Sequence, residues 1–400
     1  MLEWKLIRLG DICLTNKNSY SSKDNWKFVN YLDTGSLTEN KITELQYINI
    51  EMDKMPSRAR RKVIKNSILY STVRPNQLHY GIIKEPVDNL LVSTGFTVID
   101  VDTNKAIPEF IYYLLTQNNT TEQLQAIAEQ SVSTYPSIKP SDIENLEFKL
   151  PNLIIQSKIV SILGTIDSKI RQNEKINNNL EQQAQAIFKS WFVDFELNYG
   201  VMPSDWKVSQ LGSIVKISTE VFSPAKNPNV EVEHYSIPAY DEKRYPIFET
   251  SNGIKSNKYR LSSNSVMISK LNPDTKRIWR PYCISDNPIC STEFIVYEPI
   301  NPLNRDFIYS IIDSIGFSAF LCSHTTGSTN SRQRATPSIT LTYDIVIPDE
   351  KTIQAFCSIV SPMYDTIENN IKENQKLAKT RDKLLPKLMS GELDVSGIEL

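Results

Sequence analysis

Two long stretches of the chain repeat apolar residues at alternating steps of three and four. One runs from Ile159 to Ile187, and the other runs from Phe356 to Leu384. This spacing places the apolar side chains along one narrow face of a helix, close to the heptad spacing of paired helices. Each stretch also carries two asparagines midway along that face: Asn173 and Asn177 in the first, and Asn370 and Asn374 in the second.

We interpret the two stretches as long helices that pack antiparallel against each other, because buried asparagines tend to fix the register of paired helices. A helix over residues 155–190 would be roughly 50 Å long at 1.5 Å per residue. The pair would then hold two globular units at opposite ends of a rigid strut. The alternative is that each apolar face lies on its own neighbouring domain. The narrowness of the face and a length beyond that of the mean helix favour the pair.

The remaining two parts of the chain, residues 1–152 and 198–349, share one plan. Short β-branched and aromatic runs such as 63–73 and 90–101 predict strands, and 108–118 and 120–130 predict short amphipathic helices. Five short motifs recur in the same order about 200 residues later. The matched segments are 4–12 with 206–214, 66–71 with 264–269, 93–98 with 291–296, 110–112 with 307–309, and 135–138 with 336–339. The sequence therefore predicts a tandem duplication with diverged halves, suited to reading two related but different things.

Length and composition place these parts in a multidomain α+β protein. A chain of 400 residues is too long for one ordinary core. We predict two similar mixed α/β domains, 1–152 and 198–349, separated by long helices over 153–197 and 350–400, with a pseudo-twofold internal repeat. A hydrophobic fraction of 40% with 22% charged residues is typical of a folded globular chain. We find no apolar run near the twenty residues of a membrane span and no signal-peptide start. Five cysteines without a CxxC pair fit reduced thiols in the cytoplasm.

The sequence shows no motif for catalysis. No GxG occurs among the twelve glycines and no GxxxxGK[ST] is present, which argues against a dinucleotide, adenosyl-cofactor or P-loop site. The three histidines lie far apart. Asp142 with Glu147–Lys149, and Pro348–Lys351, echo a nuclease metal site, but their spacing favours a structural role. Asn227–Asn229 we interpret as a turn. We therefore predict a chain that is not an enzyme and holds no metal or cofactor.

Basic side chains near the repeated motifs are candidates for DNA contact. Arginine and asparagine read guanine and adenine edges, while Ser, Thr and Lys suit phosphates. The net charge of −2 is low for a nucleic-acid binder, so either charge is sorted locally or the partner is not nucleic acid. The candidates in the first half are Arg58, Arg60, Arg61, Lys62, Arg74, Ser133 and Tyr135, and those in the second half are Lys270, Lys276, Arg277, Arg280, Asn330, Arg332 and Arg334.

Three segments carry a family resemblance. Residues 180–195 end the first long helix, residues 384–393 end the second, and Met202–Trp206 is followed by Leu211–Gly212. They resemble, in that order, the central conserved region, the C-terminal conserved region and the start of the second target-recognition domain of type I restriction-modification specificity subunits. The resemblance extends over essentially the whole chain.

The resemblance implies a non-catalytic subunit with two target-recognition domains, each reading one half of a bipartite double-stranded DNA target. The helices would set a gap of about one helical turn, roughly 34–36 Å. The subunit would position two methyltransferase subunits that bind S-adenosylmethionine and, where present, two restriction subunits that use ATP and Mg²⁺. The family's helix ends help to dock partners, which implies such a role for Phe188, Trp191, Phe192, Leu384, Leu385 and Leu388.

Two other functions stay open at this point. A protein–protein scaffold with duplicated binding domains would use the same architecture without salt-sensitive DNA binding. A self-sufficient modification enzyme would need a cofactor loop that the sequence does not show. The sequence leaves open the bases recognised, their gap, the presence of a restriction subunit, and whether the chain is one of several exchangeable versions.

Overall fold

The computed structural model describes residues 4–131, 135–326 and 333–399. The chain folds into two compact units, Met1–Ser168 with Leu377–Leu400, and Lys169–Lys376. Each long helix therefore contributes residues to both units. The boundaries of the four predicted segments stay a prediction.

The first unit contains two four-stranded sheets. One has the order β2-β11-β8-β9 and is antiparallel throughout. The other has the order β6-β3-β10-β7, in which only β3 and β10 run parallel. The elements are β1 (Lys5–Arg8), β2 (Cys13–Thr15), β3 (Phe28–Leu32), β4 (Leu37–Thr38), β5 (Lys41–Ile42), β6 (Gln46–Asn49), β7 (Ala59–Lys62), β8 (Ser67–Ser71), β9 (Tyr80–Ile83), β10 (Leu90–Ser93), β11 (Phe96–Val101), α1 (Pro108–Leu115), α2 (Asn118–Glu129), α3 (Pro140–Glu144) and β12 (Glu147–Leu150).

The second unit repeats this plan. Its sheets have the orders β14-β22-β19-β20 and β15-β18-β21-β16-β17, and β16 and β21 are again the parallel pair. The elements are β13 (Lys207–Gln210), β14 (Val215–Ser218), β15 (Val221–Phe222), β16 (Glu231–Tyr235), α5 (Ile237–Lys243), β17 (Ile247–Thr250), β18 (Lys258–Arg260), β19 (Val266–Ser269), β20 (Ile278–Trp279), β21 (Pro288–Ser291), β22 (Phe294–Pro299), α6 (Arg305–Asp313), α7 (Ile315–Ser323), β23 (Thr325–Thr326), β24 (Arg334–Ala335), α8 (Pro337–Thr340) and β25 (Asp344–Ile347).

Strand register confirms the duplication. Phe96 lies opposite Ser71 in the first unit, and their counterparts Phe294 and Ser269 lie opposite each other in the second. One predicted match is wrong, because α3 and α8 both begin at a proline, Pro140 and Pro337. The counterpart of 336–339 is therefore 139–142 rather than 135–138. The error arose because the first half contains two Pro-Ser pairs, Pro136-Ser137 and Pro140-Ser141, and the wrong one was matched to Pro337-Ser338.

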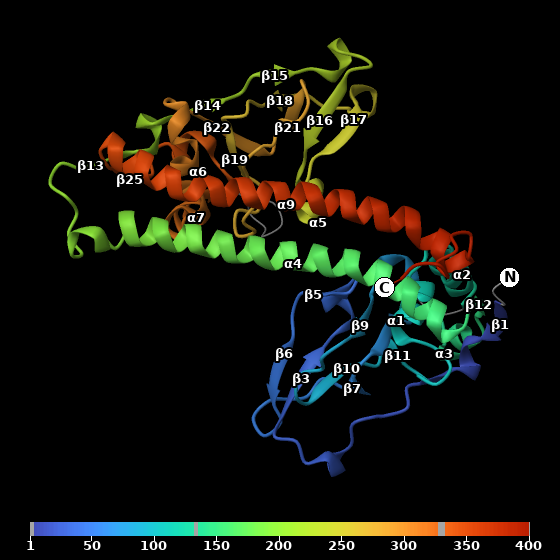
Figure 1. Cartoon of the computed structure of the whole chain (residues 1–400). Coiled ribbons are helices and arrows are strands. Elements are labelled where there is room, and N and C mark those ends of the chain that lie inside the picture. Colours follow the sequence, from blue (N-terminus) through green and yellow to red (C-terminus); the bar gives the residue numbers. More distant parts are fainter. Residues whose placement is uncertain (1–3, 132–134, 327–332, 400) are drawn as a thin grey trace. The chain divides into compact units, whose positions relative to one another are not determined.

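The two predicted long helices are confirmed as α4 (Leu153–Phe192) and α9 (Glu350–Ser390), each an unbroken helix (Figure 1). They run antiparallel within each unit. In the second unit, Asn173 donates to Asn374 across 2.8 Å and Asn370 donates to Asn177 across 2.8 Å. In the first unit, the Arg381 guanidinium lies 3.1 Å from the Asp167 carboxylate.

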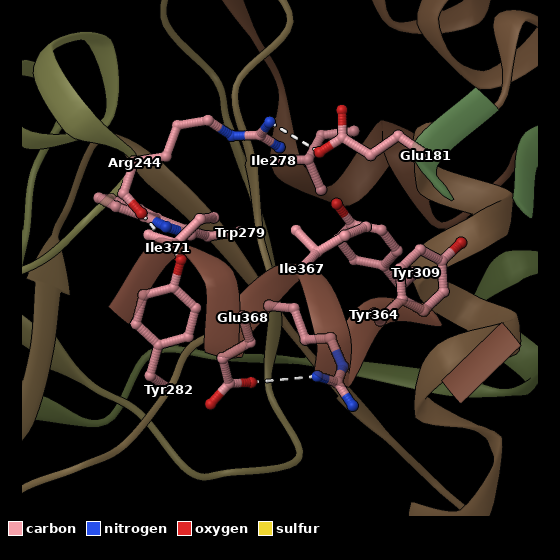
Figure 2. Close-up of a pocket in the computed structure, with 11 residues that line it drawn as sticks. Glu181, Arg244, Ile278, Trp279, Tyr282, Tyr309, Tyr364, Ile367, Glu368 and Ile371 are labelled. Carbon is pink, nitrogen blue, oxygen red and sulfur yellow. Dashed lines mark hydrogen bonds and ion pairs between the residues drawn. The ribbon is translucent and has the colours of Figure 1, made fainter. Parts of the chain in front are cut away.

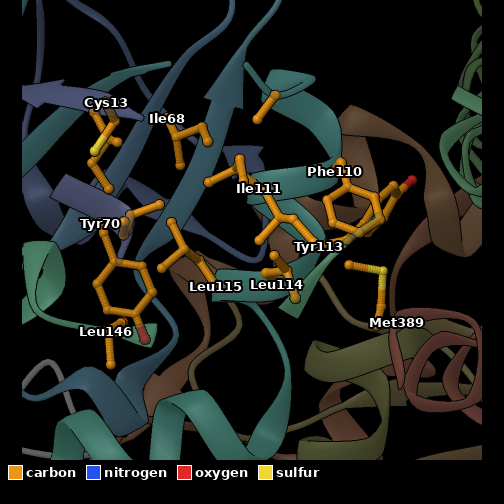
Figure 3. Packing of buried hydrophobic residues seen from close by; sticks show 14 of the residues in the cluster. Cys13, Ile68, Tyr70, Phe110, Ile111, Tyr113, Leu114, Leu115, Leu146 and Met389 are labelled. Atoms are coloured by element: carbon orange, nitrogen blue, oxygen red, sulfur yellow. The ribbon is translucent and has the colours of Figure 1, made fainter. Parts of the chain in front are cut away.

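The first turns of each long helix also pack on the neighbouring domain. In these turns the alternative interpretation is therefore correct: the apolar face of the helix lies on its own domain. Leu163 of α4 belongs to one core with Phe110 of α1 and Met389 of α9, part of which Figure 3 shows. The buried arc is consequently wider than the predicted face. Leu163 and Val360 are fully buried, whereas Ile359, which the pattern placed on the face, is 39% exposed.

Within the described ranges, no single helix is long and apolar enough to cross a membrane. The bent pair Pro302–Asp313 and Ile315–Ser323, which meet at 62°, passes that test by length and composition alone.

The aromatic junction of the second unit yields a stability prediction. The Phe356 ring is fully buried against Phe188, Trp191, Phe192 and Phe307. Replacing Phe356 with alanine should lower the free energy of unfolding by about 3–5 kcal/mol, because the side chain leaves a cavity. Urea denaturation measures this change.

The control for this prediction is Ile359→Ala on the same helix. Ile359 is 39% exposed, so its truncation should cost about 1 kcal/mol or less. Equal losses in the two variants would contradict the packing described for α9.

Candidate nucleic-acid interface

The loop that follows β8 has the same backbone hydrogen bonds as the loop that follows β19. In the first unit the Ser71 hydroxyl donates to the Val73 carbonyl and accepts from its N–H, and in the second Ser269 does the same with Leu271. The next residues also bond alike. The equivalent pairs are Thr72 N–H to Gly95 O (2.8 Å) with Lys270 N–H to Glu293 O (2.9 Å), Arg74 N–H to Pro136 O (3.0 Å) with Asn272 N–H to Gln333 O (2.9 Å), and Ile138 N–H to Thr72 O (2.8 Å) with Ala335 N–H to Lys270 O (2.9 Å). We call this shared arrangement the loop frame.

In the first unit the loop frame gathers several of the predicted DNA-contact residues. Thr94 donates its N–H to the Arg58 carbonyl across 2.9 Å, which ties Arg58 to the β10–β11 turn and so to the frame. Arg58, Arg60 and Arg74 are exposed. The Arg74 guanidinium lies 4.9 Å from the centre of the Tyr135 ring. Arg58, Arg74 and Tyr135 therefore lie at the loop-frame edge of the first unit. A surface that contacts DNA requires such a grouping. Ser133 lies outside the described residues.

Arg61 and Lys62 differ from their predicted role. Side chains alternate along a strand, and the one at position 61 of β7 turns inward. Arg61 is half-buried, its Nε has no hydrogen-bond partner among the described residues, and burial lowers its pKa. Lys62 pairs with Asp24 and lies 5.2 Å from the centre of the Trp26 ring. Both side chains are therefore engaged in local packing.

Most of the basic cluster predicted in the second half is neutralised inside its own unit, which corrects that prediction. Lys276 pairs with Asp313 across 2.5 Å, and Arg277 binds both oxygens of Asp241 at 2.6 and 2.9 Å. Short-range charge pairing leaves these groups little capacity for phosphate contact.

Arg280 differs most from its predicted role in DNA contact, because its side chain is only 8% exposed. It bonds to Asp306 at 2.8 Å, Asp365 at 2.7 Å and Glu368 at 3.1 Å. Burial acts to raise the pKa of Asp306, but Arg280 and Arg305 outweigh it and hold that pKa below its usual range. Arg280 is therefore a structural residue that joins the domain to α9.

Two residues of the predicted second-half cluster, Lys270 and Arg334, do lie on the loop frame of the second unit. Lys270 is half-buried, and Arg334 is exposed with its Nε 3.1 Å from the Glu293 carboxylate. Glu293 stands where the first unit has Gly95. The predicted residues Asn330 and Arg332 lie outside the described residues.

The sequence reasoning missed the second-unit counterpart of β7. That strand is β18, which occupies the same place in its sheet and brings Lys255, Lys258 and Arg260 with it. Lys255 is exposed, Lys258 is buried and donates to Ser256, and Arg260 lies 5.0 Å from the centre of the Phe222 ring. The same shift of about 200 residues that revealed the repeat would have found them. The high density of basic residues between Lys270 and Arg280 pointed to that cluster instead.

The helix-end residues predicted to dock partners lie in intrachain cores. Phe188, Phe192 and Leu388 are 8%, 4% and 2% exposed, and Trp191, Leu384 and Leu385 are half-buried. In the folded chain these aromatic and leucine side chains therefore pack on a core of their own unit. Exposed apolar residues follow the end of α4 directly: Val193, Leu197, Tyr199 and Val201.

A small cavity of about 30 Å³ lies in the second unit beside α4, α6 and α9. Figure 2 shows Arg244 bonded to Glu181, a hydrogen bond of 2.7 Å. Arg280, which also lines the cavity, donates to Glu368 at 3.1 Å. Tyr282, Tyr309 and Tyr364 also line it. A space of this size holds about one water molecule, so the cavity belongs to the polar core of the unit.

The residues that echo a nuclease site have structural roles. The Asp142 carboxylate accepts the Lys139 N–H at 2.7 Å and caps α3. Asp349 accepts the N–H groups of Lys351 and Thr352 at the start of α9, and these bonds, with that of the Thr352 hydroxyl, lower its pKa. Among the described residues no group of three or more His, Cys, Asp or Glu could hold a metal ion.

Residues 1–182 match a family model described as the type I restriction modification DNA specificity domain. The chain is 38% identical over 198 residues to the specificity subunit of the type I restriction enzyme HindI from Haemophilus influenzae, a match that spans 49% of this chain and 42% of that protein. It is 26% identical to the MjaIX specificity subunit from Methanocaldococcus jannaschii, over 98% of this chain and 93% of that one.

One solved structure supports the same architecture. The type I restriction-modification S subunit from M. genitalium aligns with a TM-score of 0.60, covering 99% of this chain and 97% of that chain. Its sequence identity is 15%, so this likeness bears on the fold alone.

The buried arginine cluster yields a second stability prediction. Replacing Arg280 with methionine leaves the Asp306 carboxylate, 6% exposed, without its main partner. Breaking such a buried pair should lower the free energy of unfolding by about 3–5 kcal/mol. The variant Arg280→Met/Asp306→Asn should recover part of the loss, because the uncompensated charge is removed. Thermal or urea unfolding monitored by circular dichroism measures all three proteins, and a neutral effect of Arg280→Met would refute the structural assignment.

Proposed function

Because this chain belongs to the family of type I restriction-modification specificity subunits, we propose that it reads a bipartite DNA target, one half-site with each α+β domain. The target-recognition domains are the folds built around β2-β11-β8-β9 in the first unit and β14-β22-β19-β20 in the second. The observation that carries the proposal is the loop frame, which has the same backbone in both units and different side chains on it. A repeated backbone with changed side chains suits two readers of different base sequences.

The chain's partners and chemistry follow from the same proposal. It positions two methyltransferase subunits, which bind S-adenosylmethionine and methylate adenine. Where restriction subunits are present, they supply ATP-driven translocation and cutting with Mg²⁺. The chain itself performs no chemistry and holds no cofactor. The matched region spans less than half of the HindI subunit, so these roles rest on the family as a whole.

The low net charge is compatible with DNA binding because opposite charges are sorted within the chain. Lys276, Arg277 and Arg280 neutralise acidic side chains of their own unit. Arg58, Arg60 and Arg74 form no carboxylate pair among the described residues and stay exposed. Partner subunits supply further phosphate contacts, because this chain has a net charge of −2 and so no overall basic excess.

The test co-expresses the chain with the methyltransferase encoded beside it and maps methylated adenines across a test genome. Methylation should occur at one split motif. Exchanging residues 198–349 for those of another family member should change one half of the motif and leave the other. A stable complex that methylates no motif would instead favour the protein–protein scaffold.

Replacing Arg58 and Arg60 with alanine should weaken binding of the assembled complex to all DNA sequences about equally. Each lost phosphate contact should reduce the slope of log affinity against log salt concentration by about 0.9. Fluorescence anisotropy with duplex DNA over a salt series measures the slope. The matched control is Arg277→Ala, which should leave the slope unchanged because Arg277 is paired with Asp241.

Replacing Arg332 and Arg334 with alanine should relax the second half-site only. Each lost bidentate base contact should cost about 1–3 kcal/mol. Competition binding with single-base-pair variants of both half-sites measures the change. If both half-sites weakened equally, or neither did, the assignment of these arginines to base reading would be wrong.

A further inference from the structure

Arg74 holds an unusual backbone conformation for its residue type. It lies in the left-handed region at φ 48° and ψ 70°, immediately before Pro75. An L-residue with a long side chain is strained in this conformation, which glycine and asparagine adopt more readily. Such strain persists where the surrounding structure enforces it, and it gathers at functional sites.

The loop frame explains what enforces the conformation. The Arg74 N–H donates to Pro136 O, and its carbonyl accepts the Gln77 N–H at 2.8 Å. The equivalent residue of the second unit is Asn272, which also has φ 48°, also precedes a proline, and makes the equivalent bonds to Gln333 and Thr275. The second unit thus carries a residue type that suits the frame, whereas the first unit carries arginine against local preference.

The Arg74 side chain is oriented but not neutralised. Its guanidinium lies 4.9 Å from the Tyr135 ring centre, a cation–π contact that restrains the planar group. The described residues place no carboxylate on it. In the second unit, Glu293 holds the nearby Arg334, and the first unit has Gly95 at that position. A Cβ on Gly95 would stand 2.5 Å from the Thr34 hydroxyl, so a side chain at this position would force Thr34 to shift.

Resting on the proposed function, we propose that Arg74 is a specificity-determining residue that reads one guanine of the first half-site. An arginine fork held in one orientation matches the O6 and N7 acceptors of guanine in the major groove, whereas a phosphate contact needs no such restraint. The ring of Tyr135 positions the fork. The equivalent position of the second half, Asn272, lacks this group, so the two halves differ in the base they require there.

The test maps methylated adenines in cells that express the complex of this chain and its methyltransferase, with Arg74→Asn against wild type. Asparagine is the residue that the second unit carries on the same frame, so the variant should fold. The preference for guanine should fall about tenfold or more at one base pair of the first half-site. The second half-site and the gap should not change. Tyr135→Ala should relax the same base pair, and Tyr135→Phe should retain it.

Arg58→Asn is the matched control, because it removes the same charge from the same edge. It should lower methylation at all sites about equally without changing the motif. If Arg74→Asn gave that uniform pattern, or left the motif intact, the guanine assignment would be overturned while the proposed function stood. If the wild-type complex methylated no split motif, the proposed function would fail and the assignment with it.

Discussion

The need to bury the apolar faces of two forty-residue helices governs the rest of the structure. Neither α4 nor α9 can be stable in water alone with such a face exposed. In each unit the solution is the same, because one helix lies against the other and both lie against a domain. Asn173, Asn177, Asn370 and Asn374 interrupt the apolar contact with paired amides. A shifted register would bury unpaired amides, at a cost of about 1–3 kcal/mol each.

Ion pairs also determine how the long helices pack within each unit. Arg280, Arg244 and Arg381 are each bonded to at least one carboxylate within their own unit. Of these three, the pair of Arg280 with Asp306 is buried, with side chains 8% and 6% exposed. Such a pair contributes little net stability but makes any other arrangement costly, since a lone buried charge is strongly unfavourable. Arg58, Arg60 and Arg74, beside β7 and on the first loop frame, stay exposed and form no carboxylate pair among the described residues. The division between structural and available cations therefore follows from burial rather than from sequence position.

The two loop frames show how one backbone can carry different side chains. Their hydrogen bonds involve main-chain groups and two equivalent serines, so they survive wide change in the other side chains. The positions that differ, such as Arg74 against Asn272 and Gly95 against Glu293, change charge and reach without altering the frame.

The sequence by itself determined the elements that depend on local periodicity and on repetition. The spacing of Ile159 to Ile187 and of Phe356 to Leu384 predicted both long helices, and the recurring motifs predicted the duplicated α+β plan. Tertiary structure alone decided which charges are free. Lys276, Arg277 and Arg280 looked like a binding cluster because density of charge is visible in a sequence, but their partners Asp313, Asp241 and Asp306 are distant in the chain. The helix-end aromatics were likewise recognisable as a motif, yet only packing showed that they face a core. Period and repeat are properties of neighbouring positions along the chain, whereas pairing and burial are set by residues that folding brings together.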